Sequence, residues 1–159
     1  MDQQLILGFN TVFSNKKNRV NGTRDDDVID GDGRRDIVKS KAGDDIVNTG
    51  AGNDFVLAGT GDDFVNGGAD DDLLSGGDGR DTFIFTGEFG DDVVLDFSSG
   101  RGVEDVLLID VASFDSVADV LSAAEQDGEN TVIALGTAGT ITLENVQASQ
   151  LHQDDFMIA

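Results

Sequence analysis

The sequence predicts an all-β fold: a solenoid of short parallel strands, followed by a small β-rich module with one short helix. Three observations predict it. Aspartate recurs about every nine residues between positions 26 and 81. Each of these aspartates is followed two residues later by an apolar residue, and most are preceded by glycine. After residue 85 this interval stops, and short runs of alternating apolar and polar residues begin.

The chain is expected to divide into three parts. Residues 1–20 form an N-terminal capping segment, because the end of a solenoid must be covered and this stretch is partly apolar. Residues 21–84 form the solenoid, and residues 85–159 form a module that caps its other end. The apolar residues expected to cover the first coil are Leu5, Ile6, Leu7, Phe9 and Phe13.

The repeat has the form of half a solenoid coil. A very short strand follows each aspartate, with its middle side chain pointing inward, and glycines permit the tight loop before it. Two repeats make a coil of 18 residues, and stacked coils pair as parallel strands around a narrow core. The repeat aspartates are Asp26, Asp36, Asp45, Asp54, Asp63, Asp72 and Asp81. The inward residues are Val28, Val38, Val47, Val56, Val65, Leu74 and Phe83.

The composition is strongly acidic. Asp and Glu number 32 against 10 Lys and Arg, so the formal charge is −22, while an apolar content of 38% still permits a core. Such a chain repels nucleic acid and anionic membranes, and its own carboxylates repel one another unless cations intervene. There is no cysteine, which excludes disulfides and thiolate metal sites. The first residues lack the basic start and long apolar run of a secretory signal peptide.

The grooves between stacked loops are expected to bind a hard cation. Tight loops direct carbonyl oxygens into a shared groove, and aspartates 18 residues apart meet there. Oxygen ligands in a flexible geometry suit calcium, whereas zinc and copper favour nitrogen and sulfur ligands.

The repeat resembles the Gly-Gly-x-Gly-x-Asp-x-apolar-x unit of the RTX, or hemolysin-type, nonapeptide family, in seven tandem copies over residues 21–84. The resemblance implies a right-handed parallel β-roll. It also implies that calcium lies between loop n and loop n+2, held by two aspartates and by backbone carbonyls. About three to five ions are expected.

The family pattern, carried onto this sequence, gives three well-formed sites. The first pairs Asp45 with Asp63 and uses the carbonyls of Ser40, Ala42, Gly59 and Gly61. The second pairs Asp63 with Asp81 and uses those of Ala58, Thr60, Gly77 and Gly79. The third pairs Asp54 with Asp72 and uses those of Thr49, Ala51, Gly68 and Asp70, with Gly50 and Gly52 in the same loop. The pairs Asp36–Asp54 and Asp26–Asp45 are weaker, because Arg24, Arg34, Arg35 and Lys41 interrupt the pattern.

The C-terminal part is expected to contain strands, a helix and a hairpin. Strands are predicted within 91–100 and 103–110, and a hairpin around the turn at 136–139. A helix within 114–128 begins at Asp115 or Ser116 and stops at Gly128. A further group of acidic residues either holds another ion or, as the favoured interpretation, forms a solvated face: Asp91, Asp92, Asp96, Glu104 and Asp105.

The segment also resembles the C-terminal module that follows RTX repeats in proteins exported by type I secretion, down to the ending DDFMIA. The resemblance implies a secreted, extracellular bacterial protein with a type I exporter as its partner. The alternative interpretation of the ending is a docked last strand. The predicted protein binds calcium, is exported unfolded and folds on extracellular calcium. It is not an enzyme, because no catalytic constellation accompanies His152, the only histidine.

Two further functions stay open as alternatives. One is a polysaccharide-binding module similar to the R-modules of alginate epimerases. Its anionic ligand would contact a basic group that otherwise only solubilises this end of the chain: Lys16, Lys17, Arg19, Arg34 and Arg35. The other is a self-assembling surface protein or homodimer. Its contacts would be outward apolar stripes, Ile37, Phe55, Leu57 and Leu73 on one face and Ile46 and Phe64 on the other, unless another part of the chain covers them.

Overall fold

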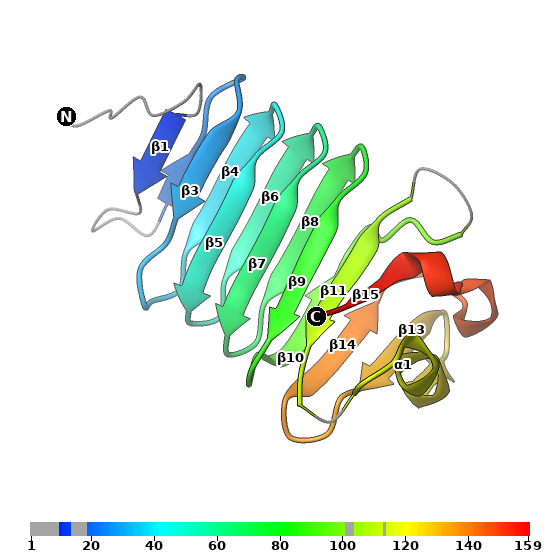
Figure 1. Cartoon of the computed structure of the whole chain (residues 1–159). Helices are drawn as coiled ribbons and strands as arrows, with labels where there is room; N and C mark the ends of the chain where they lie inside the picture. Colours follow the sequence, from blue (N-terminus) through cyan, green and yellow to red (C-terminus); the bar gives the residue numbers. More distant parts are fainter. Residues whose placement is uncertain (1–9, 14–18, 101–103, 113) are drawn as a thin grey trace.

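The chain winds into a parallel β-roll in the computed structural model, which describes residues 10–13, 19–100, 104–112 and 114–159 (Figure 1). Successive strands of the repeats alternate between two sheets, so each coil contributes one strand to each sheet. Strands make up nearly all of the regular structure in the described residues, which contain a single short α-helix, so the predicted all-β fold is confirmed. No helix in these ranges is both long and apolar enough to cross a membrane.

The first sheet has seven parallel strands in the order β1-β3-β5-β7-β9-β11-β15. They are β1 (Asn10–Phe13), β3 (Asp27–Asp30), β5 (Ile46–Ala51), β7 (Phe64–Ala69), β9 (Thr82–Thr86), β11 (Val106–Asp110) and β15 (Phe156–Ile158). The second sheet has eight strands in the order β12-β13-β14-β10-β8-β6-β4-β2. They are β2 (Arg19–Asn21), β4 (Ile37–Ala42), β6 (Phe55–Thr60), β8 (Leu73–Asp78), β10 (Gly90–Val94), β14 (Gly139–Leu143), β13 (Asn130–Ala134) and β12 (Ala124–Asp127).

The main part of the core of the roll is one line of large apolar side chains from each sheet. β-Branched residues dominate it because they pack well on a pleated surface when every second side chain points inward. In the second sheet the line is Val20, Val38, Val56, Leu74 and Val94, each at most 2% exposed. In the first sheet it is Ile29, Val47, Val65, Phe83 and Leu107, with the same limit.

The first repeat lies in a different frame from the one predicted. Ile29, not Val28, fills the core, and Val28 pairs in register with the outward Ile46. Asp27 therefore takes the position assigned to Asp26, and the interval of nine residues holds from there to Asp81. The prediction was wrong because residues 25–27 are three consecutive aspartates.

Both sheets continue past residue 84, the expected end of the solenoid. β10 and β14 extend the second sheet, and β11 and β15 extend the first. The C-terminal part thus adds further layers to the same roll, and the antiparallel hairpin of β13 and β14 is confirmed. Two 3-10 turns, Ala148–Gln150 and Gln153–Asp155, precede β15.

Helix α1 (Val117–Ala123) is shorter than predicted. Ser116 is its N-cap, as expected, and accepts a hydrogen bond from the backbone N–H of Asp119. The helix ends at Ala123 because the next residues form β12, which pairs antiparallel with β13. Gly128, the predicted helix stop, lies beyond β12 with a φ of 62°.

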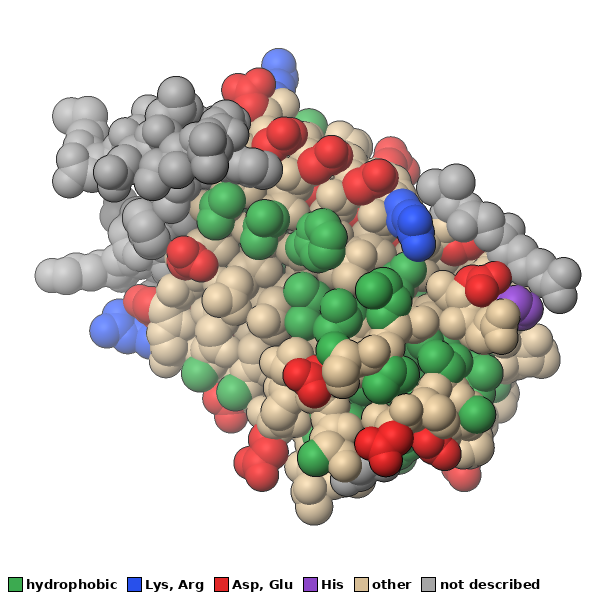
Figure 2. Space-filling view, viewed as in Figure 1, with side chains coloured by type: hydrophobic (Ala, Val, Ile, Leu, Met, Phe, Trp, Pro, Cys, Tyr) green, Lys and Arg blue, Asp and Glu red, His purple; other side chains and the backbone are tan. Residues whose placement is uncertain are grey.

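Apolar side chains also line the outer faces of the roll. Ile37, Phe55 and Leu73 pair in register on the second sheet, and Ile46 pairs with Phe64 on the first. Figure 2 shows hydrophobic side chains exposed on one face, beside a row of acidic side chains. The most exposed large apolar side chains are Ile46, Phe64, Leu73 and Met157. What meets these stripes stays a prediction.

Inward and outward neighbours on one strand give a direct test of the core. Val65 is fully buried, whereas Phe64 is 48% exposed. Val65→Ala is expected to lower the free energy of unfolding by about 1–3 kcal/mol, because it leaves a cavity in a narrow core. Phe64→Ala is expected to change it by about 0.5 kcal/mol or less. Urea unfolding in saturating calcium measures both, and a larger loss for Phe64→Ala would contradict the assigned faces.

Candidate metal centre

The repeat aspartates end the loops that connect the two sheets. We call residues 22–27, 40–45, 58–63 and 76–81 the first loop stack, and residues 31–36, 49–54 and 67–72 the second loop stack. The last residue of every loop is an aspartate at most 2% exposed: Asp27, Asp36, Asp45, Asp54, Asp63, Asp72 and Asp81. Seven acidic side chains are thus withdrawn from water, which is costly unless each is paired.

These aspartates form two carboxylate rows, joined by hydrogen bonds. In each row the backbone N–H of one aspartate donates to Oδ1 of the aspartate in the next loop, at 2.6 to 3.0 Å. The first row is Asp27, Asp45, Asp63, Asp81 and Asp105, and the second is Asp36, Asp54, Asp72 and Asp92. Asp92 and Asp105 are 1% and 2% exposed, so the predicted solvated face was wrong for these two residues.

The second oxygen of most repeat aspartates has no hydrogen-bond partner. Oδ2 is buried and unpaired in Asp45, Asp54, Asp63, Asp72 and Asp81. In the first two repeats, by contrast, Oδ2 of Asp27 accepts from the backbone N–H of Thr23, and Oδ2 of Asp36 accepts from that of Asp32. An unpaired buried acceptor costs about 1–3 kcal/mol, and more when it is charged. The five oxygens therefore call for a cation.

Burial also makes the carboxyl groups resist ionisation. It raises the pKa of Asp63, Asp72 and Asp81 from the usual 3.8 to about 7. It raises the pKa of Asp45 and Asp54 to about 6 and that of Asp92 to about 8. The backbone N–H donors oppose this effect, and the neighbouring carboxylates of the same rows add to it.

Glycine is required where the loops stack, because carbonyl oxygens of one loop face the next. A Cβ on Gly59 would lie 2.2 Å from the carbonyl oxygen of Lys41, and one on Gly61 would lie 2.2 Å from that of Gly43. The same contact recurs from Gly50 to Gly68, from Gly59 to Gly77 and from Gly61 to Gly79. The glycines that receive these contacts have positive φ, which other residues rarely adopt: Gly59, Gly61, Gly68, Gly77 and Gly79.

The loop carbonyls predicted to line the gaps point toward the other neighbouring loop from the one expected. The carbonyl oxygens of Ser40 and Thr49 lie against Gly22 and Gly31 of the preceding loops. That of Thr60 accepts a hydrogen bond from the backbone N–H of Gly43, and so faces the preceding loop as well. The gap between loops 40–45 and 58–63 thus receives the carbonyls of Lys41, Gly43 and Thr60. The predicted set exchanged the contributions of the two loops, because spacing alone does not orient a peptide plane.

Side chains alone do not complete a metal site. Within the described ranges, no three Asp, Glu or His side chains converge on one point. Each gap instead brings together two carboxylates and several backbone carbonyls, a set made of oxygen only. Such a set suits a hard cation with a flexible coordination number. The unpaired Oδ2 atoms show that the carboxylates present fit such an ion.

The sequence profile of the RTX calcium-binding nonapeptide repeat, in four copies, matches this chain at residues 15–47, 30–65 and 48–83. Residues 15–83 are RTX calcium-binding repeats. Asp92 and Asp105 lie outside the matched residues, although both carboxylate rows pass through them. No curated protein matches the sequence.

Several solved structures are similar in outline. The extracellular lipase of Serratia marcescens aligns at 16% identity with a TM-score of 0.48, over 87% of this chain and 39% of the lipase. The chain thus spans about two fifths of that enzyme's length. Two subunits of the mannuronan C5-epimerase of Azotobacter vinelandii align at 26% and 21% identity, each with a TM-score of 0.45. They cover 86% and 91% of this chain, and 80% and 95% of their own.

A second, exposed row of side chains runs beside the first carboxylate row of the RTX repeats. Oδ1 of Asp26 accepts from the backbone N–H of Asp44, that of Asp44 from Asp62, and that of Asp62 from Arg80, each at 2.9 Å. Asp26 therefore belongs to this outer row, and the predicted Asp26–Asp45 pair is replaced by Asp27–Asp45. Counting back nine residues from Asp36 would have found Asp27.

Two non-glycine residues interrupt the glycine pattern with positive φ. Lys41 has a φ of 94° and Asp70 a φ of 76°, where neighbouring repeats hold glycine. Such a backbone conformation costs of order 1 kcal/mol in a residue with a side chain. The ammonium of Lys41 donates to the carbonyl of Gly22, which ties loop 40–45 to loop 22–27. Lys41, which interrupts the glycine pattern in the sequence, thus makes a hydrogen bond between two loops that a glycine could not make.

Two of the basic residues proposed for an anionic glycan, Arg34 and Arg35, lie beside acidic residues. Arg34 is 3.8 Å from Asp32, and Arg35 lines a cleft with Asn53 and Asp71. Arg19 is exposed at the start of β2. Lys16 and Lys17 lie outside the described residues.

The raised pKa values predict how pH acts on the chain without calcium. The unfolded chain has ordinary carboxyl groups, so at pH 5 the folded state binds more protons than the unfolded state does. The cost of the buried carboxylates is therefore full above about pH 8 and is relieved as pH falls through 7 and 6. In chelator, circular dichroism should show more β-structure at pH 5 than at pH 8. Equal or smaller β-content at pH 5 would contradict this expectation.

Proposed function

We propose that this chain is a calcium-dependent folding unit, which leaves the cell unfolded through a type I exporter and folds when it meets extracellular calcium. The observation that carries the proposal is the set of five buried carboxylate oxygens without a hydrogen-bond donor. Stacked carboxylates repel one another, and a chain of charge −22 favours disorder when nothing neutralises them. Calcium supplies the positive charge and accepts the oxygen ligands that the loops present.

Three gaps are the proposed ion sites. They lie between loops 40–45 and 58–63, between loops 58–63 and 76–81, and between loops 49–54 and 67–72. Each is bounded by two aspartates of one carboxylate row, Asp45 and Asp63 in the first case. Extracellular calcium modules bind with a Kd of about 10⁻⁴ M, and calcium at about 100 times that value stabilises the folded state by about 2.7 kcal/mol per site. Three such sites match the whole stability of a small domain.

The C-terminal residues have a structural position alongside their proposed role in export. Asp155 is fully buried and accepts hydrogen bonds from the backbone N–H groups of Gly100 and His152. Phe156 is 5% exposed in β15, which pairs with β11. An exporter that reads this ending must therefore meet it before the last strand docks, which favours export of the unfolded chain. The polysaccharide-binding and self-assembling alternatives stay predictions.

A calcium titration tests the proposal as a whole. The chain in excess chelator at pH 8 is expected to be mainly disordered, and to gain β-structure cooperatively as calcium rises. Magnesium should substitute poorly, because it demands near-octahedral geometry and releases its water reluctantly. Circular dichroism follows both titrations. The same β-content in chelator and in millimolar calcium would contradict the proposal.

Adjacent aspartates provide a matched pair of variants. Asp63 borders two of the proposed gaps, whereas Asp62 lies in the exposed outer row. Asp63→Asn should raise the calcium concentration at the folding midpoint about tenfold or more, because it removes a charge shared by two sites. Asp62→Asn should raise it by about twofold or less, since an exposed carboxylate is screened. Equal midpoints for the two variants would contradict the assignment of the inner row.

Removal of Asp154–Ala159 separates export from calcium binding. In a host with a type I exporter, the truncated chain is expected to stay inside the cell. The purified truncated chain should still bind calcium, because no proposed repeat ligand lies in the deleted residues. Isothermal titration measures the binding and immunoblotting of the medium measures the export. Secretion at the level of the full chain would place the export signal elsewhere.

A further inference from the structure

Loop 87–92 lies outside the nonapeptide repeats but is built like one of their loops. Asp92 is 1% exposed, and its Oδ1 accepts from the backbone N–H of Asp72 at 2.8 Å. Asp72 makes the same contact with Asp54 at 2.7 Å. Gly90, two residues before Asp92, has a φ of 103°, and Val94, two residues after it, pairs with Leu74 in the core. The loop thus reproduces the repeat, although 20 residues instead of 18 separate its aspartate from the one before.

Oxygen atoms line the gap between loop 67–72 and loop 87–92. Asp72 is 1% exposed and leaves its Oδ2 without a hydrogen-bond partner. That oxygen lies over its own loop, where a Cβ on Gly67 would meet it at 2.1 Å. The carbonyl oxygen of Asp70 faces the other loop, 2.6 Å from the position of a Cβ on Gly90. The gap is therefore bordered by the buried carboxylates of Asp72 and Asp92 and by a facing carbonyl, the same arrangement as at the proposed repeat sites.

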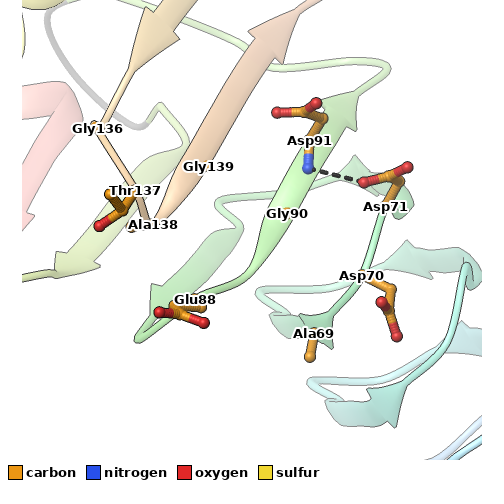
Figure 3. A pocket seen from close by; sticks show the side chains of 10 residues that line it. All are labelled: Ala69, Asp70, Asp71, Glu88, Gly90, Asp91, Gly136, Thr137, Ala138 and Gly139. Carbon is orange, nitrogen blue, oxygen red and sulfur yellow. Dashed lines mark hydrogen bonds between the residues drawn. The ribbon is translucent and has the colours of Figure 1, made fainter.

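The outer mouth of this gap is strongly acidic. It opens into a cleft of about 510 Å³ whose lining includes Asp70, Asp71, Glu88 and Asp91, and none of the described residues that line it is basic. Figure 3 shows Asp71 and Asp91 side by side, where Oδ1 of Asp71 accepts from the backbone N–H of Asp91 at 3.0 Å. Carboxylates around a concave surface raise the local concentration of divalent cations.

The C-terminal hairpin forms the next layer on loop 87–92. The carbonyl of Ala138 accepts from the backbone N–H groups of Phe89 and Gly90, at 2.9 and 3.2 Å. A Cβ on Gly139 would lie 1.8 Å from the carbonyl oxygen of Gly90, the same close stacking as in the repeats. Ile141 pairs in register with Asp92 and ends the carboxylate row. The position of β14 therefore depends on the loop that carries Asp92.

We infer that a calcium ion binds between loop 67–72 and loop 87–92, with Asp72 and Asp92 as its carboxylate ligands, and that this ion couples the C-terminal hairpin to the roll. The inference rests on the proposed calcium binding by the repeats and extends it beyond them. It gives the hairpin, which contains no repeat of its own, a calcium-dependent attachment.

A count of bound ions in the full-length chain tests the inference. Asp92→Asn keeps the oxygen that accepts from Asp72 and removes only the charge. This variant is expected to bind one calcium ion fewer than the unaltered chain in isothermal titration. Asp127→Asn, at an exposed aspartate of β12 that does not line the cleft, is expected to bind the same number as the unaltered chain. An undiminished count for Asp92→Asn would overturn the inference while leaving the repeat sites intact, whereas no binding by the unaltered chain would overturn both proposals.

Hydrogen exchange on the unaltered chain gives a second test that needs no variant to fold. The amides of β14, Gly139–Leu143, should gain protection over the same calcium range as those of loop 67–72. Protection of β14 in chelator equal to that in calcium would overturn the inference.

Discussion

Repulsion between buried carboxylates is the constraint on which the rest of this molecule depends. Each coil places an aspartate directly over the aspartate of the coil before, and both lie almost completely out of water. Backbone N–H groups donate to only one oxygen of each carboxylate. In five consecutive repeats the other oxygen has no hydrogen-bond donor. Without a cation, the same stacking that builds the sheets builds an unfavourable column of charge. In the function proposed above, folding and ion binding are therefore one equilibrium.

The loop backbone supplies further oxygen atoms to the gaps, and the close stacking that this requires determines which residue types the loops can contain. Carbonyl oxygens reach the gaps only because successive loops stack without side chains between them, so glycine recurs where a Cβ would strike the preceding carbonyl. The strands between loops are so short that one large inward side chain from each sheet makes up most of the core of a coil. The second inward position holds a small residue, such as Ser40, Thr49 or Ala58. Valine, isoleucine or leucine fills nearly all of the large inward positions, and larger rings appear only at Phe83 and beyond. There the roll meets its C-terminal layers, and Phe83 packs against Phe97.

Much of this arrangement could be predicted from the sequence because the repeat is periodic. The two sheets, the buried aspartates from Asp36 onward and the inward line of Val38, Val47 and their counterparts follow from an interval of nine residues. The first repeat could not be placed by its acidic residues, since three aspartates stand in a row. The sequence could not predict which loop carbonyls point to the preceding loop and which to the following loop, because the same spacing of residues allows a peptide plane to face either way. Asp92 and Asp105 were missed as row members because insertions of unequal length hide them. Their signal was an apolar residue two positions later, Val94 and Leu107, as in every repeat.

The hydrogen bonds of the inner and outer rows run in opposite directions along the roll. In the inner row each aspartate binds the N–H of the coil before it, and in the outer row each side chain binds the N–H of the coil after it. Several loops contain two adjacent aspartates, such as Asp44–Asp45 and Asp62–Asp63, so a strand that slipped by one residue would still offer an acidic side chain to either row. The acidic contacts therefore tolerate a wrong frame. The apolar residue rejects it, because a slip turns valine outward to water, and the loop glycines reject it, because a slip places a Cβ against the preceding carbonyl. The frame of each repeat is therefore set by its inward aliphatic side chain and by its loop glycines, and not by its aspartates.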